Sequence, residues 1–334
     1  MVTVYDIAKA VGVTKTTVAN ALAGKPNVSE ATRQRILQCA QEMGYRPNLL
    51  ARSFSQRKTF TISLILPSIS HPFYPEVAEA IQIYASGSEY QTILCNTRSN
   101  YVLGKQQMER LVSRWVDGCV VMEESMDIAD LVQYFQQGLP LVLCDWQEHE
   151  PPPDIPQVRG DYFRAGVLAA EHVLDLGHRH VAVIVDEPGQ ILRLQGFCTC
   201  LQQAGITVPR EMILHGDSSV QSGYAAVQTL LTAPVLPTAI FATTDLMAIG
   251  ALNALLDAGL RVPQDISLIG LDDITISSHI RPSLTTIGFP KEQLAKEVVE
   301  LLFAQIHESR EITHLRLIEP YLVVRQSTTG PRSE

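Results

Sequence analysis

Acidic side chains follow several strand-like segments of this 334-residue chain. Asp145 ends the run LPLVLCD, Asp186 ends HVAVIVD and Asp272 ends ISLIGLD. A fourth carboxylate, Asp245, follows the run TAIFATT, and Arg193 lies a short distance after HVAVIVD. Carboxylates accept hydrogen bonds from vicinal hydroxyl groups and an arginine donates several. The set therefore suits a cleft that binds a small polar ligand such as a polyol.

No catalytic motif accompanies these residues. The chain contains no GxxxxGK[ST], GxSxG or HExxH, and no GxGxxG after a strand. Its nine histidines are scattered along the sequence. We therefore expect ligand binding without turnover, no enzyme activity, and no cofactor or metal. An α/β enzyme of sugar metabolism is the alternative, and turnover of a ligand by the purified protein would support it.

The elements that must position these groups alternate along the chain from residue 61 onward. Strand-like runs cover 61–67, 90–96, 117–122, 139–145, 180–186, 238–245 and 266–272. Helical stretches lie around 74–86, 104–115, 161–176, 190–205, 219–232, 245–258 and 290–307. Continuous apolar strands between helices indicate parallel, doubly wound sheets covered on both faces, with ligands at the carboxyl ends of the strands. Seven such units and a proline-rich break at 150–156 predict a two-lobed α/β body.

The first residues predict a separate all-α headpiece. Helical spacing of apolar residues indicates short helices over 4–11, 15–23 and about 30–43. Thr14 and Ser29 stand where they would cap the second and third helices. A tight turn containing glycine between the first two helices is typical of a helix-turn-helix.

The second of these helices carries side chains suited to base edges in the major groove. Lys15 and Thr16 lie at its start, and Asn20 follows one turn later on the same face. Lysine suits guanine and asparagine suits adenine, and a good pair discriminates by ~1–3 kcal/mol. Thr17 is better placed for a phosphate. The alternative is a small helical bundle that contacts nothing.

Charge separates the two parts of the chain. Residues 1–58 hold nine Lys/Arg and three Asp/Glu, a net charge of +6, whereas the remaining residues hold 17 and 32, a net charge of −15. This asymmetry favours a basic module that meets DNA and an acidic body that does not. The segment 46–54, RPNLLARSF, is too short for a stable isolated helix and suits a hinge that orders on DNA.

The runs YDIAKAVGVTKTTVANALAGKPNVSEATRQRI and GYRPNLLARSF resemble the headpiece and hinge of the lactose-repressor (LacI/GalR) family, in its ribose- and purine-repressor branch. The resemblance covers essentially the whole chain. It implies a homodimer on a pseudo-palindromic double-stranded operator, with Tyr45 on the DNA backbone. It also implies hinge helices in the minor groove, with Ala51 at the small position and Phe54 in place of the usual leucine wedge.

The same resemblance implies an effector site and a domain plan. The matching effector positions are Phe73, Tyr74, Asp145, Trp146, Arg193 and Asp272, joined by His71 and Asp245. The expected domains are a helix-turn-helix domain over 1–46, a hinge over 47–58 and an effector-binding and dimerisation domain over 59–334. Its first lobe would take about 59–158 and 290–319, and its second lobe about 159–289 and 320–334.

Several of these assignments have a structural alternative. Asp186 and Asp245 could cap the helices that follow them as readily as contact a ligand, and Phe73 and Tyr74 could be core aromatics. His71, Thr244 and Phe289 depart from the ribose pattern, and the purine pattern is incomplete near 187–189. We therefore expect a small sugar or a related polar metabolite.

The ends and cysteines of the chain bear on its location. The sequence begins MVTVYDIAK without the features of a signal peptide, and no apolar run is long enough to span a membrane. Its six cysteines include no CxxC pair, which favours reduced thiols over a disulfide framework or a zinc site. We expect a cytoplasmic protein. A solute receptor for transport is a second alternative, and recovery in an exported fraction would support it.

Overall fold

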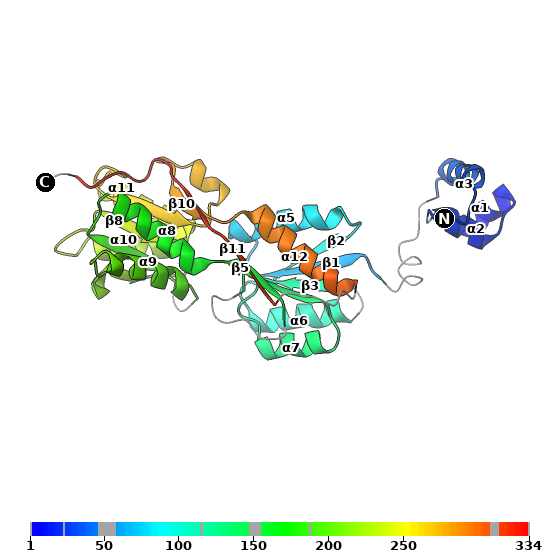
Figure 1. Cartoon of the computed structure of the whole chain (residues 1–334), viewed down its shortest axis with the longest axis horizontal. Coiled ribbons are helices and arrows are strands. Elements are labelled where there is room, and N and C mark those ends of the chain that lie inside the picture. The colour runs from blue at the N-terminus through cyan, green and yellow to red at the C-terminus, as the bar shows by residue number, and fades with distance from the viewer. Residues whose placement is uncertain are drawn as a thin grey trace. The chain divides into compact units, whose positions relative to one another are not determined.

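The computed structural model describes residues 2–22, 24–45, 58–113, 116–146, 155–186, 189–307 and 314–332. The chain divides into two compact units, Met1–Thr59 and Phe60–Glu334 (Figure 1). The predicted hinge, with Ala51 and Phe54, lies outside the described residues.

The headpiece contains the three predicted helices, α1 (Val4–Val11), α2 (Lys15–Leu22) and α3 (Glu30–Glu42). The side chains of Thr14 and Ser29 accept hydrogen bonds from backbone amides in the first turns of α2 and α3, as the sequence predicted. The start of α1 has a capping box that the sequence analysis did not predict, in which Thr3 and Asp6 bond each other's backbone amides.

The core of the headpiece is small and apolar. It is formed by one stripe from each helix, with Ile7, Val18 and Ile36 fully buried. Because three helices enclose so few apolar side chains, each of them contributes a large part of the packing that positions α2.

The body is a pair of α/β lobes, each built on a six-stranded sheet. The sheet of the first lobe has the order β11-β5-β4-β3-β1-β2, and all of its pairs are parallel. Its strands are β1 (Thr61–Leu66), β2 (Gln91–Asn96), β3 (Gly118–Val121), β4 (Leu141–Cys144), β5 (Gln157–Gly160) and β11 (Leu315–Ile318). Its helices are α5 (Phe73–Ser86), α6 (Tyr101–Val112), α7 (Ile128–Gln136) and α12 (Lys291–Ile306).

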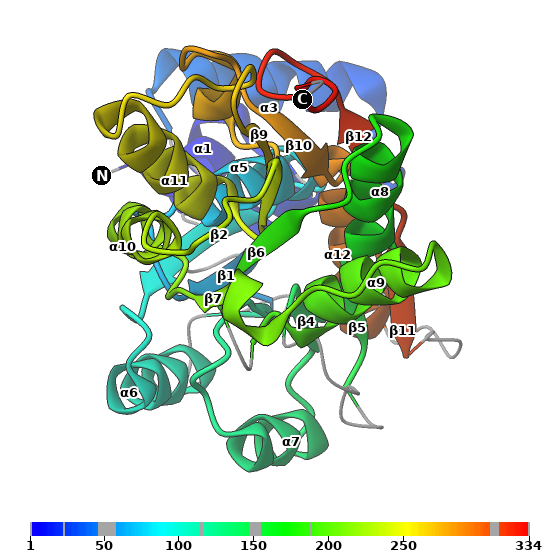
Figure 2. The same ribbon diagram turned by 90° about the vertical axis from the view of Figure 1, so that its left-hand side faces the viewer.

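The second lobe has the strand order β12-β10-β9-β8-β6-β7. Its strands are β6 (Val181–Val185), β7 (Ile213–His215), β8 (Ala239–Ala242), β9 (Ser267–Leu271), β10 (Thr285–Gly288) and β12 (Tyr321–Val323). Its helices are α8 (Tyr162–Asp175), α9 (Ile191–Gln203), α10 (Val220–Leu230) and α11 (Asp245–Asp257), with the 3-10 turns η1 (Arg210–Met212) and η2 (Thr275–Ser278) (Figures 1 and 2).

The central strands of both sheets are buried on both faces, as continuous apolar strands predict, whereas the edge strands β2, β7, β11 and β12 are partly exposed. In β1, Ile62 and Leu64 face one apolar cluster and Ile65 faces another. In β6, Val183 belongs to the first of these clusters, which extends through both lobes, whereas Ile184 belongs to a third. The first apolar cluster therefore contains residues of both lobes.

All seven predicted apolar strands are present, whereas five short strands of the described residues and helix α7 were not predicted. The chain crosses between the lobes after β5, after β10 and after β11, and the missed strands β5, β10, β11 and β12 border these crossings. Polar residues interrupt the apolar pattern of β5, β10 and β11. One strand also departs from the predicted parallel arrangement, because β12 is antiparallel to β10. Only residues 319–320 separate β11 from β12, so one extended segment leaves the first sheet and enters the second in the opposite sense.

Helices α8 and α9 approach each other through two glycines. A Cβ atom added to Gly166 would lie 2.1 Å from the carbonyl oxygen of Arg193, and one added to Gly196 would lie 2.0 Å from that of Phe163. Neither contact is physically allowed, so the two backbones pack closer than any side chain permits. This close packing positions Arg193 relative to the start of α8.

Substitution Gly166→Ala should therefore separate the two helices and destabilise the body. We expect the free energy of unfolding, measured in urea, to fall by about 1–3 kcal/mol, the usual cost of overpacking a core. Gly87→Ala is the matched control, because its nearest contact would be an ordinary 3.4 Å, and it should change stability by less than about 0.5 kcal/mol. Equal unfolding midpoints for the two variants would contradict this account.

Candidate functional site

Two aspartates at the carboxyl ends of strands have an unusual backbone conformation. Asp145 follows β4 with φ 50°, and Asp272 follows β9 with φ 122°. Positive φ is rare for residues other than glycine and is retained mainly where a site requires it. These bends place one carboxylate from each lobe at the edges where the sheets end.

Arg193 in α9 is the positive charge of this site. It is buried, and its Nη1 atom donates to the carbonyl oxygen of Thr243 at 2.6 Å and lies 3.9 Å from Asp272 Oδ1. Burial raises the pKa of Asp272 well above its ordinary value, and the charge of Arg193 opposes that rise. The pair therefore holds a carboxylate and a guanidinium out of water beside the place where the lobes meet.

Tyr162 joins the two predicted groups, although the sequence analysis did not single it out. Its ring lies 4.1 Å below the guanidinium carbon of Arg193, and its hydroxyl donates to Asp145 Oδ1. Burial raises the pKa of Asp145, while this hydrogen bond and Arg193 lower it. No local signal indicated Tyr162, because it looks like any apolar residue at the start of a helix.

The first residues of α5, together with His71 just before it, supply further side chains. His71 and Tyr74 have ring centroids 5.3 Å apart, and Phe73 meets Tyr74 edge to face at 5.5 Å. Phe73 is buried in the apolar cluster, in agreement with the alternative that it is a core aromatic, whereas Tyr74 is half-buried. Burial and the charge of Arg193 lower the pKa of His71 to about 4, so its ring is neutral at pH 7.

Two buried polar atoms of this group lack a hydrogen-bond partner among the described residues. They are Oδ2 of Asp272 and Nδ1 of His71. A buried acceptor or donor without a partner costs free energy, about 1–3 kcal/mol, and native proteins retain few of them. The site therefore has unused capacity to bond a polar ligand.

Two predicted effector residues lie elsewhere. Asp245 is fully buried inside the second lobe, where its carboxylate accepts from the amide of Ile274 and the hydroxyls of Ser277 and Thr286. It does not cap α11 either, because Thr244 does so. Trp146 is buried with apolar residues of the first lobe. Both side chains are packed or bonded within one lobe, although the charge of Asp245 contributes to the raised pKa of Asp272.

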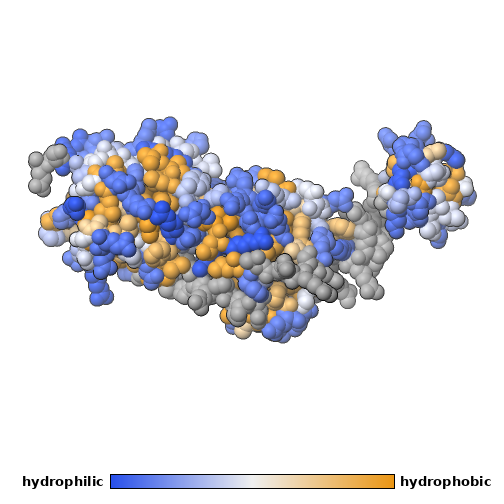
Figure 3. Space-filling model, in the orientation of Figure 1, coloured by the Kyte–Doolittle hydropathy of each residue, from blue (hydrophilic) through white to orange (hydrophobic). Residues whose placement is uncertain are grey.

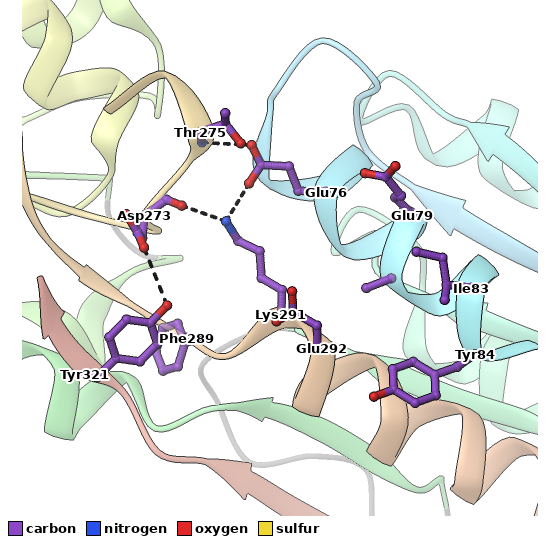
Figure 4. Close-up of a pocket in the computed structure, with 11 residues that line it drawn as sticks. Glu76, Glu79, Ile83, Tyr84, Asp273, Thr275, Phe289, Lys291, Glu292 and Tyr321 are labelled. Carbon is purple, nitrogen blue, oxygen red and sulfur yellow. Dashed lines mark hydrogen bonds and ion pairs between the residues drawn. The ribbon is translucent and has the colours of Figure 1, made fainter. Parts of the chain in front are cut away.

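A second set of contacts bridges the lobes beside this group (Figure 4). Lys291 Nζ lies 2.5 Å from Glu76 Oε2 and donates to the carbonyl oxygen of Asp273 at 2.8 Å. Glu76 Oε1 accepts from the amide of Thr275 at 2.9 Å. These residues line a pocket of about 350 Å³ that also includes Tyr321. The bridge links the start of α5 to the loop that carries Asp272.

Four of the predicted DNA-contacting residues lie on α2, and Tyr45 follows α3. Lys15 and Thr16 are exposed at the start of α2, and Asn20 is half-buried one turn later. Thr17 bonds Thr14 through its hydroxyl at 2.9 Å. Tyr45 is half-buried and packs against the headpiece core. The helix therefore presents its first turn to solvent, as base contact requires.

Two of the basic residues counted toward DNA binding serve the headpiece itself. Arg33 donates to the carbonyl oxygens of Ala21 and Lys25, and Arg35 donates to that of Val11. These carbonyls lie at or just beyond the carboxyl ends of α2 and α1, where a cation is favourable. The surplus of positive charge is therefore partly structural.

No described helix is long and apolar enough to cross a membrane. Within the described ranges, no three His, Cys, Asp or Glu side chains are grouped as metal ligands would be.

Comparisons with known proteins agree with this architecture. A family model for bacterial regulatory proteins of the lacI family matches residues 3–48, and one for a periplasmic binding protein-like domain matches 170–328. The HTH-type transcriptional repressor PurR of Pasteurella multocida is 35% identical over 332 residues, 98% of each chain.

Solved structures give the same result. The Lac repressor dimer bound to operator and the anti-inducer ONPF is 26% identical with a TM-score of 0.87, covering 98% of this chain and 99% of that one. The complex of the transcriptional regulator CelR with cellobiose is 29% identical with a TM-score of 0.73, covering 98% and 100%.

A helix-turn-helix unit and a two-lobed periplasmic-binding-protein-like unit in one chain define a DNA-binding transcription regulator. The chain belongs to the LacI family of bacterial regulatory proteins. It is a regulator and not an enzyme, since the relatives that match its full length are named as repressors.

The neutral state of His71 predicts how stability depends on pH. The histidine pKa is about 6.5 in the unfolded chain and about 4 in the folded protein. The contribution of neutral His71 to the free energy of unfolding is therefore complete above pH 6.5. It is lost as the pH falls toward 4, by at most about 1.4 kcal/mol for each pH unit. The variant His71→Gln should lose less free energy of unfolding between pH 7.5 and pH 5.5 than the wild type.

The exposed His180 provides the control. His180→Gln should follow the wild-type pH dependence in the same urea titrations. Equal losses for the wild type and both variants would show that His71 is not held neutral by burial.

Proposed function

We propose that the chain is a repressor that binds a pseudo-palindromic operator as a homodimer through Lys15, Thr16 and Asn20. The observation that carries this part is the exposed first turn of α2 on a headpiece whose caps and small core hold it rigidly. Thr17 and Tyr45 would contact the DNA backbone. A DNA-binding regulator of this kind acts in the cytoplasm.

The remaining parts of this proposal concern the hinge, the domain boundaries and the dimer. Ala51 and Phe54 would enter the minor groove, with Phe54 as the wedge. The domains would be 1–46, 47–58 and 59–334, with the lobe boundaries given above. Exposed apolar side chains on the body, among them Ile83 and Tyr84 on α5, favour a second copy as the partner (Figure 3).

The base-reading role can be tested by selecting binding sites from randomised DNA. The wild type should select two-fold related half-sites about 10 base pairs apart. Asn20→Ala should lose preference at one base pair of each half-site, worth ~1–3 kcal/mol. Gln38→Ala, on the exposed face of α3, is the control and should select the wild-type profile. A wild-type profile for Asn20→Ala would refute the assignment.

We propose further that a small sugar or related polar metabolite binds between the lobes and controls operator affinity. The observation that carries this part is the group formed by Asp145, Arg193, Asp272, Tyr74 and His71, with two buried atoms that lack partners. Two similar solved structures, the CelR complex and a LacI family regulator from Enterococcus faecium, contain cellobiose and ribose respectively. A ligand alters DNA affinity only through different affinities for the two states of the body.

A thermal-shift screen against sugars, sugar acids and nucleobases tests this part. A true effector should raise the melting temperature and change affinity for the selected operator. Asp272→Asn should bind it at least about tenfold more weakly, because a charge-assisted hydrogen bond is lost, while the variant still folds. Asp257→Asn, at an exposed aspartate bonded to Tyr224, should bind the effector normally. Unchanged affinity in Asp272→Asn would exclude this site.

A further inference from the structure

One tyrosine contacts charged groups of both lobes at once. Tyr162 is the first residue of α8 and is 97% buried, with only 3% of its surface exposed. Its ring face lies 4.1 Å from the guanidinium carbon of Arg193, and its hydroxyl donates to Asp145 Oδ1. Arg193 belongs to the second lobe, whereas Asp145 ends a strand of the first. A single side chain therefore spans the junction between them.

The position of this tyrosine is fixed by a second aromatic ring. Phe289 packs edge-on against Tyr162, with ring centroids 5.1 Å apart and planes inclined by 74°. Phe289 follows β10 at one crossing, and Gly160 ends β5 at another. A Cβ atom on Gly160 would lie 2.5 Å from two carbons of the Phe289 ring, so glycine leaves the space that the ring occupies.

Tyr162 affects both groups that it contacts, the Arg193 guanidinium through its ring and the pKa of Asp145 through its hydroxyl. A cation that is removed from water is stabilised by an aromatic face beside it. The Tyr162 hydroxyl lowers the pKa of Asp145, against the burial that raises it. Removal of the hydroxyl alone would leave Arg193 supported but Asp145 with one donor fewer. Removal of the ring would release both, so the two effects are separable by substitution.

We propose that Tyr162 is a positioning residue of the effector site, which holds the Arg193 guanidinium and the Asp145 carboxylate in place across the two lobes. The Tyr162 ring covers one face of the Arg193 guanidinium, and the Tyr162 hydroxyl donates to Oδ1 of Asp145. The effector role of this arrangement rests on the function proposed above.

The test compares Tyr162→Phe and Tyr162→Leu with the wild type, on the full-length protein without any ligand. The first readout is the rate at which phenylglyoxal modifies Arg193, followed by peptide mass spectrometry. The second is the pKa of Asp145, followed by the chemical shift of its ¹³C-labelled carboxyl group and assigned with Asp145→Asn.

Tyr162→Phe should leave the labelling rate of Arg193 unchanged and raise the pKa of Asp145 by about one unit. Tyr162→Leu should raise that pKa as well and increase the labelling rate of Arg193 about tenfold. Tyr224→Phe is the matched control, since Tyr224 also donates to an aspartate, at 3.0 Å on the exposed surface of the same lobe. It should change neither readout.

Two results would overturn the proposal. One is an Asp145 pKa in Tyr162→Phe equal to that of the wild type. The other is a wild-type labelling rate in a folded Tyr162→Leu protein, with folding checked by circular dichroism. Both readouts are taken without ligand, so their failure is independent of the effector screen. Failure of the effector screen would appear as the absence of any ligand-dependent shift in the melting temperature of the wild type.

Discussion

Removal of charge from water at the junction of two lobes is the constraint on which this structure depends. A buried carboxylate is tolerated only when a cation or hydrogen-bond donors compensate for the lost hydration. Asp272 and Asp145 obtain this compensation from Arg193 and Tyr162, which come from two helices whose glycines each pack against the backbone of the other helix. The close packing of α8 and α9, the bent strand ends and the aromatic pair at the crossings all serve the same small group of charges.

The sequence predicted those parts of the molecule whose signal is local. Apolar runs such as TISLIL and VAVIV become strands because both sheet faces are buried, and Thr14 and Ser29 become caps because their hydroxyls reach the nearby amides. The strands at the crossings were missed because pairing between distant segments, and not their own composition, makes them strands. Helix α7 was missed although Asp127 caps it and its apolar residues recur at helical spacing, so a usable signal was present.

The candidate site divides in the same way. Arg193 and Asp272 were predicted because polar residues at strand ends of doubly wound lobes converge. Tyr162 was not, because nothing near it in the chain reveals that its ring faces a cation from another helix. Asp245 and Trp146 have the right place in the sequence, but local bonds and packing already occupy them. Arg33 and Arg35 show the same limit in the headpiece, where net charge does not distinguish a helix cap from a DNA contact.

The path of the chain through β11 and β12 also governs the order in which the body is assembled. Residues 315–318 complete the edge of the first sheet, and 321–323 complete that of the second. Ser327 then bonds the backbones of Leu268 and Thr285 inside the second lobe. During synthesis, a headpiece that needs only its own three helices is free to fold early, whereas both lobes wait for residues 315–329. A nascent chain therefore acquires its DNA-reading unit well before it acquires the unit that we propose controls it.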